Sequence, residues 1–81
     1  MLFLIEYDRP SGKLLQLRKF GESEWRTAND ARLELEIDLN RRGIQREVVI
    51  LDAPNEEALR HTHGRYFKDF AEQARERAGK L

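Results

Sequence analysis

The spacing of apolar positions predicts two strands in the first 20 residues. Residues 2–7 read LFLIEY and are rich in strand-forming side chains. Residues 14–20 form a second such segment. Between the two segments, Pro10 suits a tight turn because its φ is fixed, and Gly12 can adopt positive φ without steric cost. We therefore expect a β-hairpin whose second strand lies at a sheet edge, where the basic residues 18–19 discourage pairing with a foreign strand.

Residues 23–42 carry two conflicting patterns. Residues 33–39 read LELEIDL, an alternation typical of a strand, but their Leu and Glu content favours a helix. Gly43 also follows the segment at the place of a left-handed C-terminal cap. We therefore predict a helix with Ser23 as N-cap (Asn29 and Asp30 are later alternatives) and with Ile44 packed against Leu39 at its end. Its apolar stripe is predicted to contain Trp25, Ala28, Ala31, Leu35 and Leu39.

This helix would be apolar on two faces. At about 100° per residue, Leu33 and Ile37 lie almost opposite the stripe that contains Leu35 and Leu39. Only one of the two faces can meet the protein's own sheet. The other face is a candidate contact surface.

A third strand and a second helix are predicted in the remainder of the chain. The run VVIL at 48–51 is typical of a strand buried on both faces. Asn55 then suits a helix N-cap, and the two glutamates after it suit the first turn. We predict one helix over residues 56–78, with residues 79–81 frayed and Gly64 as a candidate kink. Its stripe would contain Leu59, His63, Tyr66, Phe70 and Ala74, flanked by Phe67.

The predicted order β-β-α-β-α describes a single small α+β domain over residues 1–81. A strand–helix–strand crossover makes the second and third strands parallel, and the first strand is antiparallel to both. We place the first, most apolar strand at the centre of a three-stranded mixed sheet in the order 2-1-3. The order 1-2-3 would put Arg18 and Lys19 on the central strand. Both helices are expected on one face; the alternative is a second helix that crosses to the other face and forms three layers.

With both helices on one face, the opposite face of the sheet would be open and apolar. Monomers rarely leave such a face in contact with water. We therefore expect a homodimer or a protein partner to cover it. The predicted contact residues are Leu2, Leu4, Leu14, Gln16, Leu33 and Ile37.

The charge balance and composition narrow the classes of partner. The 15 Lys and Arg residues equal the 15 Asp and Glu residues, whereas nucleic-acid-binding proteins typically carry a basic excess. The absence of cysteine excludes disulfides and thiolate sites. The first apolar run stops at Glu6, which is too early for a signal peptide or a membrane span. We expect a cytoplasmic protein.

Two groups of polar residues are candidate sites. His61 and His63 are two positions apart, so neither a helix nor a strand lets them ligate one metal, and we expect no metal or other cofactor. His63 and Tyr66 share a helix face and could line a small polar pocket, with His63 as a general acid or base. The candidate nucleic-acid contacts, on one broad face of the last helix, are Arg60, Lys68 and Arg75.

These patterns predict an architecture but do not identify a reaction. No nucleophile is matched to a base elsewhere in the chain, which argues against an enzyme. The leading hypothesis is a small non-enzymatic module that homodimerises or binds a protein through the open sheet face. The alternative is a weak nucleic-acid-binding or regulatory protein that uses the basic C-terminal helix.

Overall fold

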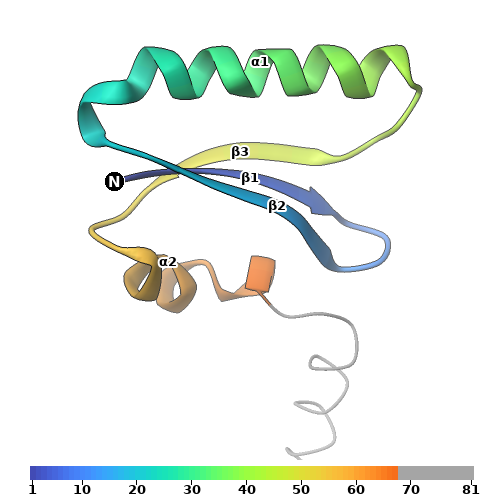
Figure 1. Cartoon of the computed structure of the whole chain (residues 1–81). Coiled ribbons are helices and arrows are strands. Elements are labelled where there is room, and N and C mark those ends of the chain that lie inside the picture. The colour runs from blue at the N-terminus through green and yellow to red at the C-terminus, as the bar shows by residue number, and fades with distance from the viewer. Residues whose placement is uncertain (68–81) are drawn as a thin grey trace, which may run out of the picture.

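The computed structural model describes residues 1–67, which form a sheet with a helix on each side (Figure 1). The predicted α+β class and element order are confirmed. The elements are β1 (Leu2–Asp8), β2 (Lys13–Phe20), the 3₁₀ turn η1 (Glu22–Glu24), α1 (Trp25–Arg41), β3 (Glu47–Asp52), α2 (Glu56–Thr62) and the 3₁₀ turn η2 (Gly64–Phe67).

The sheet has the predicted order β2-β1-β3, with the most apolar strand at its centre. Leu4 of β1 lies opposite Arg18 of β2 and Ile50 of β3. Both hydrogen-bonded pairs are antiparallel, so β2 and β3 run in the same direction, as predicted. The sheet itself is antiparallel rather than mixed, because its two parallel strands are not neighbours.

The predicted hairpin turn is confirmed at Gly12. Its φ is +69°, in the left-handed region that glycine adopts without strain. The Gly12 N–H donates to the Asp8 carbonyl at 2.8 Å, and the Ser11 hydroxyl donates to the Asp8 carboxylate. Local turn chemistry therefore fixes how β1 passes into β2.

The segment of alternating residues is a helix, as predicted, but its N-cap differs. The chain enters α1 through η1, where the Gly21 N–H donates to Glu24 Oε1 at 2.8 Å and the Glu24 N–H donates to the Gly21 carbonyl at 2.9 Å. The prediction of Ser23 as N-cap is wrong, because Glu24 reaches back over this turn and satisfies its first donor.

The C-terminal end of α1 is confirmed in detail. Gly43 has a φ of +66°, and its N–H donates to the Asn40 carbonyl at 3.1 Å. The Ile44 N–H donates to the Leu39 carbonyl at 2.9 Å. This is the pattern of a Schellman motif, and it turns the chain back toward β3.

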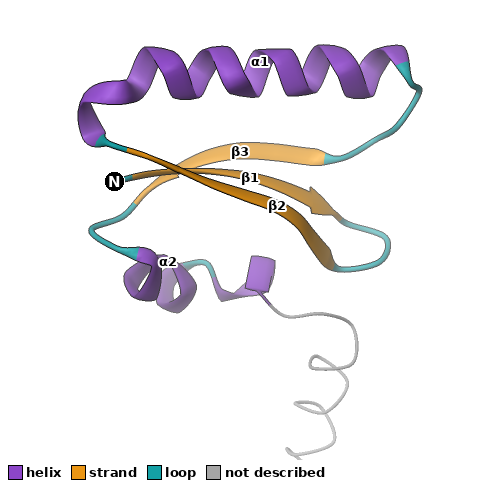
Figure 2. Cartoon of the chain, in the orientation of Figure 1, coloured by secondary structure: helices purple, strands orange, loops and turns teal. Residues whose placement is uncertain are grey.

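The prediction that both helices cover one face is wrong: α1 and α2 lie on opposite faces of the sheet (Figures 1 and 2). On the α1 side, Leu2 and Leu4 pack with Phe20 and Ala28. The cluster on the α2 side contains Phe3, Ile5, Tyr7, Ala53, Leu59 and Tyr66. Because β1 carries large apolar side chains on both faces, each face needs its own cover. The molecule therefore has the three layers of the alternative arrangement.

The second helix is much shorter than the predicted 56–78. It begins as expected at Asn55, whose Oδ1 accepts from the Ala58 N–H at 2.8 Å. It ends at Thr62, whose hydroxyl donates back to the Ala58 carbonyl at 2.9 Å, and His63 follows with φ −124° and ψ 43°. The chain then turns through η2, which buries Tyr66. The predicted stripe residues Phe70 and Ala74, and the predicted fraying, lie outside the described residues.

Candidate interaction surface

Within residues 1–67 both faces of the sheet are covered, so the open sheet face that was predicted as the interaction surface is not found there. Leu2 and Leu4 are buried beneath α1, and Leu4 is only 1 % exposed. Gln16 lies opposite Glu6 and is half-buried. Leu14 packs on the other side of the sheet, against the α2 cluster. It lies opposite Tyr7 because the β1–β2 register shifts by one residue between Glu6 and Tyr7, which moves the side chains beyond it to the other face.

Leu33 and Ile37 are the two predicted contact residues that remain accessible. Leu33 is 53 % exposed and Ile37 is 44 % exposed, both on the side of α1 that faces away from the sheet. Leu39 is buried and Leu35 is half-buried on the opposite side. The prediction of a helix with two apolar faces is thus confirmed.

The two edges of the sheet differ sharply in their protection. The β2 edge carries the bulge described above and three exposed basic residues, Lys13, Arg18 and Lys19. Lys19 Nζ also lies 3.7 Å from a carboxylate oxygen of Glu56. Bulges and edge lysines are the usual means by which proteins discourage pairing with a foreign strand. The β2 edge is therefore protected.

The β3 edge has neither form of protection. Its register with β1 is regular over Glu47–Asp52, and the strand contains no Lys, Arg or Pro. Val48 and Ile50 pack against the α1-side cluster, whereas Val49 and Leu51 pack against the α2-side cluster. All four are only half-buried because nothing within residues 1–67 lies beyond this strand.

Backbone direction identifies the groups that the β3 edge presents. The Ala53 N–H donates to the Met1 carbonyl at 3.0 Å, so Ala53 points its backbone toward β1. Since backbone groups alternate along an antiparallel strand, the N–H and C=O groups of Val48, Ile50 and Asp52 point away from β1. No backbone group within the described part of the chain pairs with them.

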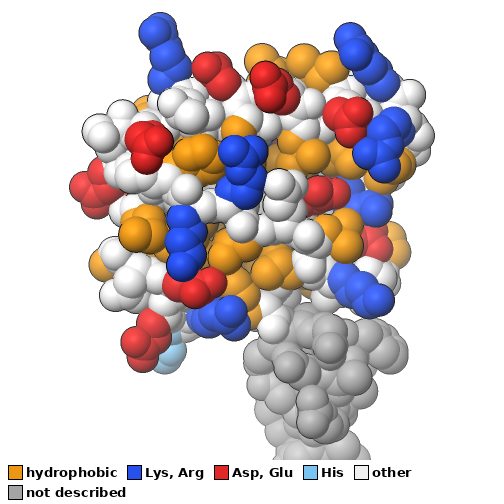
Figure 3. All heavy atoms as spheres, in the orientation of Figure 1, with side chains coloured by type: hydrophobic (Ala, Val, Ile, Leu, Met, Phe, Trp, Pro, Cys, Tyr) orange, Lys and Arg blue, Asp and Glu red, His pale blue; other side chains and the backbone are white. Residues whose placement is uncertain are grey.

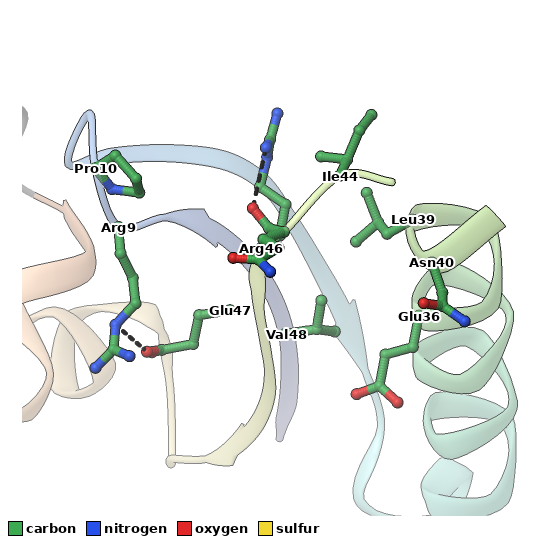
Figure 4. Close-up of a pocket in the computed structure, with 10 residues that line it drawn as sticks. Arg9, Pro10, Glu36, Leu39, Asn40, Ile44, Arg46, Glu47 and Val48 are labelled. Carbon is green, nitrogen blue, oxygen red and sulfur yellow. Dashed lines mark hydrogen bonds and ion pairs between the residues drawn. The ribbon is translucent and has the colours of Figure 1, made fainter. Parts of the chain in front are cut away.

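Trp25 lies on the flank of α1 that overlooks this edge. It was predicted to face the sheet, but it is 54 % exposed. Eleven residues make nearly three whole helical turns, so Trp25 shares a flank with Glu36. Glu36 in turn lies across a hollow from Val48 of β3 (Figure 4). The sequence pattern placed Trp25 in the buried stripe because Trp25 lies about one helical turn before Ala28, which belongs to that stripe.

The hollow beside β3 has a volume of about 600 Å³ and lies between the end of α1, the start of β3 and the β1–β2 turn (Figure 4). Its charged lining residues are balanced, with Arg9 and Arg46 against Glu36 and Glu47. Arg9 Nε lies 3.1 Å from a Glu47 carboxylate oxygen. This balance favours neither an anionic nor a cationic small ligand.

Arg46 immediately precedes β3, on the α1 side of the sheet. Its Nε lies 3.4 Å from a carboxylate oxygen of Glu6, and its Nη1 lies 3.7 Å from one of Asp8. Within the described residues the buried Nε has no hydrogen-bond partner, so these acids surround the guanidinium without saturating its donors.

On the α2 side, Glu47 is the centre of a polar cluster. The Tyr66 hydroxyl donates to its carboxylate, and Arg65 Nη2 donates to the same oxygen at 2.6 Å. The Tyr66 hydrogen bond is the main reason that the pKa of Glu47 is lowered, and Arg65 and Arg9 act in the same direction against partial burial. Burial raises the pKa of Tyr66. The cluster ties η2 to β3.

His63 and Tyr66 are neighbours, as predicted, with ring centroids 6.5 Å apart. Neither residue lines the hollow beside β3 or the one at the start of α2. The Tyr66 hydroxyl is occupied by Glu47, and its ring packs edge-on against Tyr7 at 5.1 Å. Tyr66 thus packs against the sheet and holds η2 in place.

No group of His, Asp or Glu side chains within residues 1–67 is arranged to hold a metal ion.

Of the predicted nucleic-acid contacts, only Arg60 lies in the described residues. Its guanidinium lies over the Phe67 ring at 4.5 Å and 3.8 Å from a carboxylate oxygen of Glu56. Lys68 and Arg75 lie outside that range. In the view of Figure 3, acidic and basic side chains are interspersed, and no basic face forms there.

No protein-family model, curated protein or solved structure matches the chain. No helix within residues 1–67 is long and apolar enough to span a bilayer.

Proposed function

We propose that this chain is a small non-enzymatic protein-interaction module that binds an extended polypeptide segment along the edge of β3. The contrast between the two sheet edges carries this proposal. The β2 edge combines a bulge with basic side chains, whereas β3 is regular, apolar and without either.

Strand addition would satisfy both kinds of group that this edge presents. The backbone groups of Val48, Ile50 and Asp52 supply donors and acceptors at regular intervals. The half-exposed side chains beside them supply apolar contacts on both faces of the added strand. In this mode of recognition the main-chain hydrogen bonds provide affinity and the side chains provide specificity.

The proposed contact surface is therefore the edge of the sheet at β3, in place of the open sheet face that the sequence predicts. Among the described residues the side chains of β1 are covered on both faces, but the covering helices do not form hydrogen bonds with the backbone of the outer strand β3. The need for a partner therefore moves from the apolar surface to the backbone of β3.

Amide hydrogen exchange tests the proposal directly. The probe is an octapeptide of alternating Val and Thr, added to the ¹⁵N-labelled protein. We expect slower exchange at the Val48 and Ile50 amides and little change at Lys19, whose backbone lies on the protected edge. The control is the same peptide with N-methyl groups on alternate residues, which removes one row of donors. Exchange is measured at a protein concentration at which the chain is monomeric, and unchanged exchange at Val48 and Ile50 there would contradict strand addition.

Nucleic-acid binding through the C-terminal helix remains the alternative prediction. No contact among the described residues favours it, because Arg60 is engaged with Glu56 and Phe67. A gel shift at low salt with duplex and single-stranded DNA distinguishes the two functions, since phosphate contacts strengthen as salt falls. We expect no shift.

A further inference from the structure

We infer that the segment added to β3 is β3 of a second copy of this chain, paired antiparallel about a twofold axis. This inference rests on the proposed function and names its partner. The product would be a continuous six-stranded sheet, β2-β1-β3 followed by β3-β1-β2 of the second copy.

The sequence of β3 is complementary to itself in one register. With Val49 opposite Val49 of the second copy, Val48 lies opposite Ile50 on both sides of the axis. These are residues whose backbone groups point outward, so each such pair can exchange two hydrogen bonds. Apolar side chains thus meet apolar side chains at the centre of the contact.

The same register places opposite charges at both ends of the contact. Arg46 lies opposite Asp52 of the second copy, and the twofold axis repeats this pair. Within its own chain Arg46 lies near two acids of β1, with Nε 3.4 Å from Glu6 and Nη1 3.7 Å from Asp8, so its side chain must turn outward to meet Asp52 of the second copy. Asp52 is exposed, and its only ion pair within the described residues joins it to the terminal amine at 3.5 Å. A register shifted by two residues would instead place Val48 opposite Asp52 and Arg46 opposite Pro54. Charge complementarity therefore selects the register centred on Val49.

The flank of α1 above β3 is compatible with this pairing. A twofold axis perpendicular to the sheet places α1 of both copies on the same side. Because α1 contacts β3 more than β1 or β2, it lies toward this edge, and the two α1 helices would approach each other across the axis. The flank that faces the second copy carries Trp25, the most exposed of the large apolar side chains within residues 1–67. The exposed Trp25 side chain and the unpaired edge of β3 thus lie on the same side of the molecule.

Sedimentation equilibrium on the full chain tests the inference with two proline variants. Val48→Pro removes an outward N–H from the β3 edge, and Lys19→Pro removes an outward N–H from the β2 edge. Proline is tolerated at such edge positions because the lost donor is not part of the protein's own sheet. We expect a dimer for the wild type and for Lys19→Pro, and a folded monomer for Val48→Pro, with circular dichroism to confirm folding.

A charge variant keeps the test decisive if Val48→Pro fails to fold. Asp52→Lys places a lysine opposite Arg46, and we expect the dimer to dissociate about tenfold more readily because two pairs are lost at once. Glu22→Lys is the matched control, since Glu22 contacts the same terminal amine, at 3.3 Å, but belongs to η1 and not to the β3 strand. It should leave the dimer unchanged.

The outcomes separate this inference from the function on which it rests. A wild-type monomer, or a dimer that survives both Val48→Pro and Asp52→Lys, overturns the second copy as the partner. A monomer whose Val48 and Ile50 amides are still protected by the Val–Thr peptide retains strand addition with a different partner. A monomer without that protection overturns both.

Discussion

Glu47 links three parts of the fold that are distant in sequence. It lies on β3, its carboxylate accepts from Tyr66 and Arg65 of η2, and Arg9 of the β1–β2 turn lies 3.1 Å away. A charge-assisted hydrogen bond is stronger than a neutral one, so the carboxylate is the form that holds these partners. The lowered pKa of Glu47 is the thermodynamic expression of this preference.

The first prediction concerns Glu47→Gln. The variant should be less stable by about 1 kcal/mol at pH 7, because the amide cannot replace the charge-assisted hydrogen bonds. A carboxylate with a lowered folded-state pKa stabilises the protein above the unfolded-state pKa and loses that contribution as the pH falls through the folded-state value. The difference between wild type and variant should therefore shrink below about pH 4.5.

Urea denaturation across this pH range measures the difference. Glu34→Gln is the control, since Glu34 is exposed on α1 and has no ion pair among the described residues. Its effect on stability should be small. A constant stability difference for Glu47→Gln from pH 7 to pH 3 would contradict the role of the Glu47 carboxylate.

At the scale of residues, contacts between neighbours in the sequence could be predicted, whereas contacts between distant residues could not. The Gly43 cap and its hydrogen bond from Ile44 to Leu39 arise within six residues, and the sequence predicts them correctly. The pair of Tyr66 and Glu47 spans 19 residues and exists only after η2 folds against β3. The sequence therefore singles out Tyr66 but pairs it with His63, its nearest polar neighbour on a helix that the structure ends earlier.

At the scale of elements, α1 shows how one segment can carry two apolar faces with unequal roles. Leu39 is buried against the rest of the fold, whereas Leu33 is more than half exposed. We predict that Leu39→Ala lowers the free energy of unfolding by about 2–4 kcal/mol, since it leaves a cavity. Leu33→Ala should change it by less than about 0.5 kcal/mol. Equal losses in thermal denaturation would contradict this assignment of faces.

A second prediction at this scale compares Gly43, which follows α1, with Gly64, which begins η2. Gly43 has positive φ, and a Cβ there would meet no atom within 4 Å, so Gly43→Ala is penalised by backbone conformation alone. We expect a loss of about 1 kcal/mol. Gly64 has ordinary φ and equally open surroundings, so Gly64→Ala should be neutral or slightly stabilising. Denaturant midpoints measure both, and an equal loss in the two variants would show that the cap conformation is not the cause.

The end of α2 illustrates an element boundary that local pattern does not determine. Apolar residues at helical spacing continue past Thr62, which is why the sequence predicts a helix over residues 56–78. The chain leaves the helix at His63 instead, and this turn carries Tyr66 to Tyr7 and Glu47. Tertiary contacts with the sheet thus determine the boundary, and they are invisible to a periodicity argument.

At the scale of the whole molecule, the side of the sheet that a helix covers is decided by what the sheet must bury. The sequence predicts the strand order, because a basic strand suits an edge and an apolar strand suits the centre. It does not predict the side of α2, because the connection through Pro54 permits either face. The three large side chains Phe3, Ile5 and Tyr7 require cover that α1, on the opposite face, cannot supply.

This three-layer arrangement changes the expected result of a core substitution. Under the open-face hypothesis, Leu4→Arg would give a soluble monomer. Because Leu4 is 1 % exposed between β1 and α1, the variant must bury an unpaired charge, and we predict that it does not fold at 25 °C. Leu33→Arg, on the exposed side of α1, should fold normally. Circular dichroism separates the two, and a folded Leu4→Arg would contradict the buried position of Leu4.

If β3 pairs with a second copy, folding and association become one equilibrium. The melting temperature of a dimer that unfolds to monomers rises with protein concentration, because dilution favours the separated chains. For two chains of 81 residues, each tenfold increase should raise it by about 3–5 °C. Lys19→Pro should keep this dependence, since it alters the protected edge. Val48→Pro should melt at one temperature across the same concentrations, because a monomer unfolds without a change in molecularity. A wild-type melting temperature that does not change with concentration would contradict the dimer and would mean that the edge of β3 is exposed to water in the isolated chain.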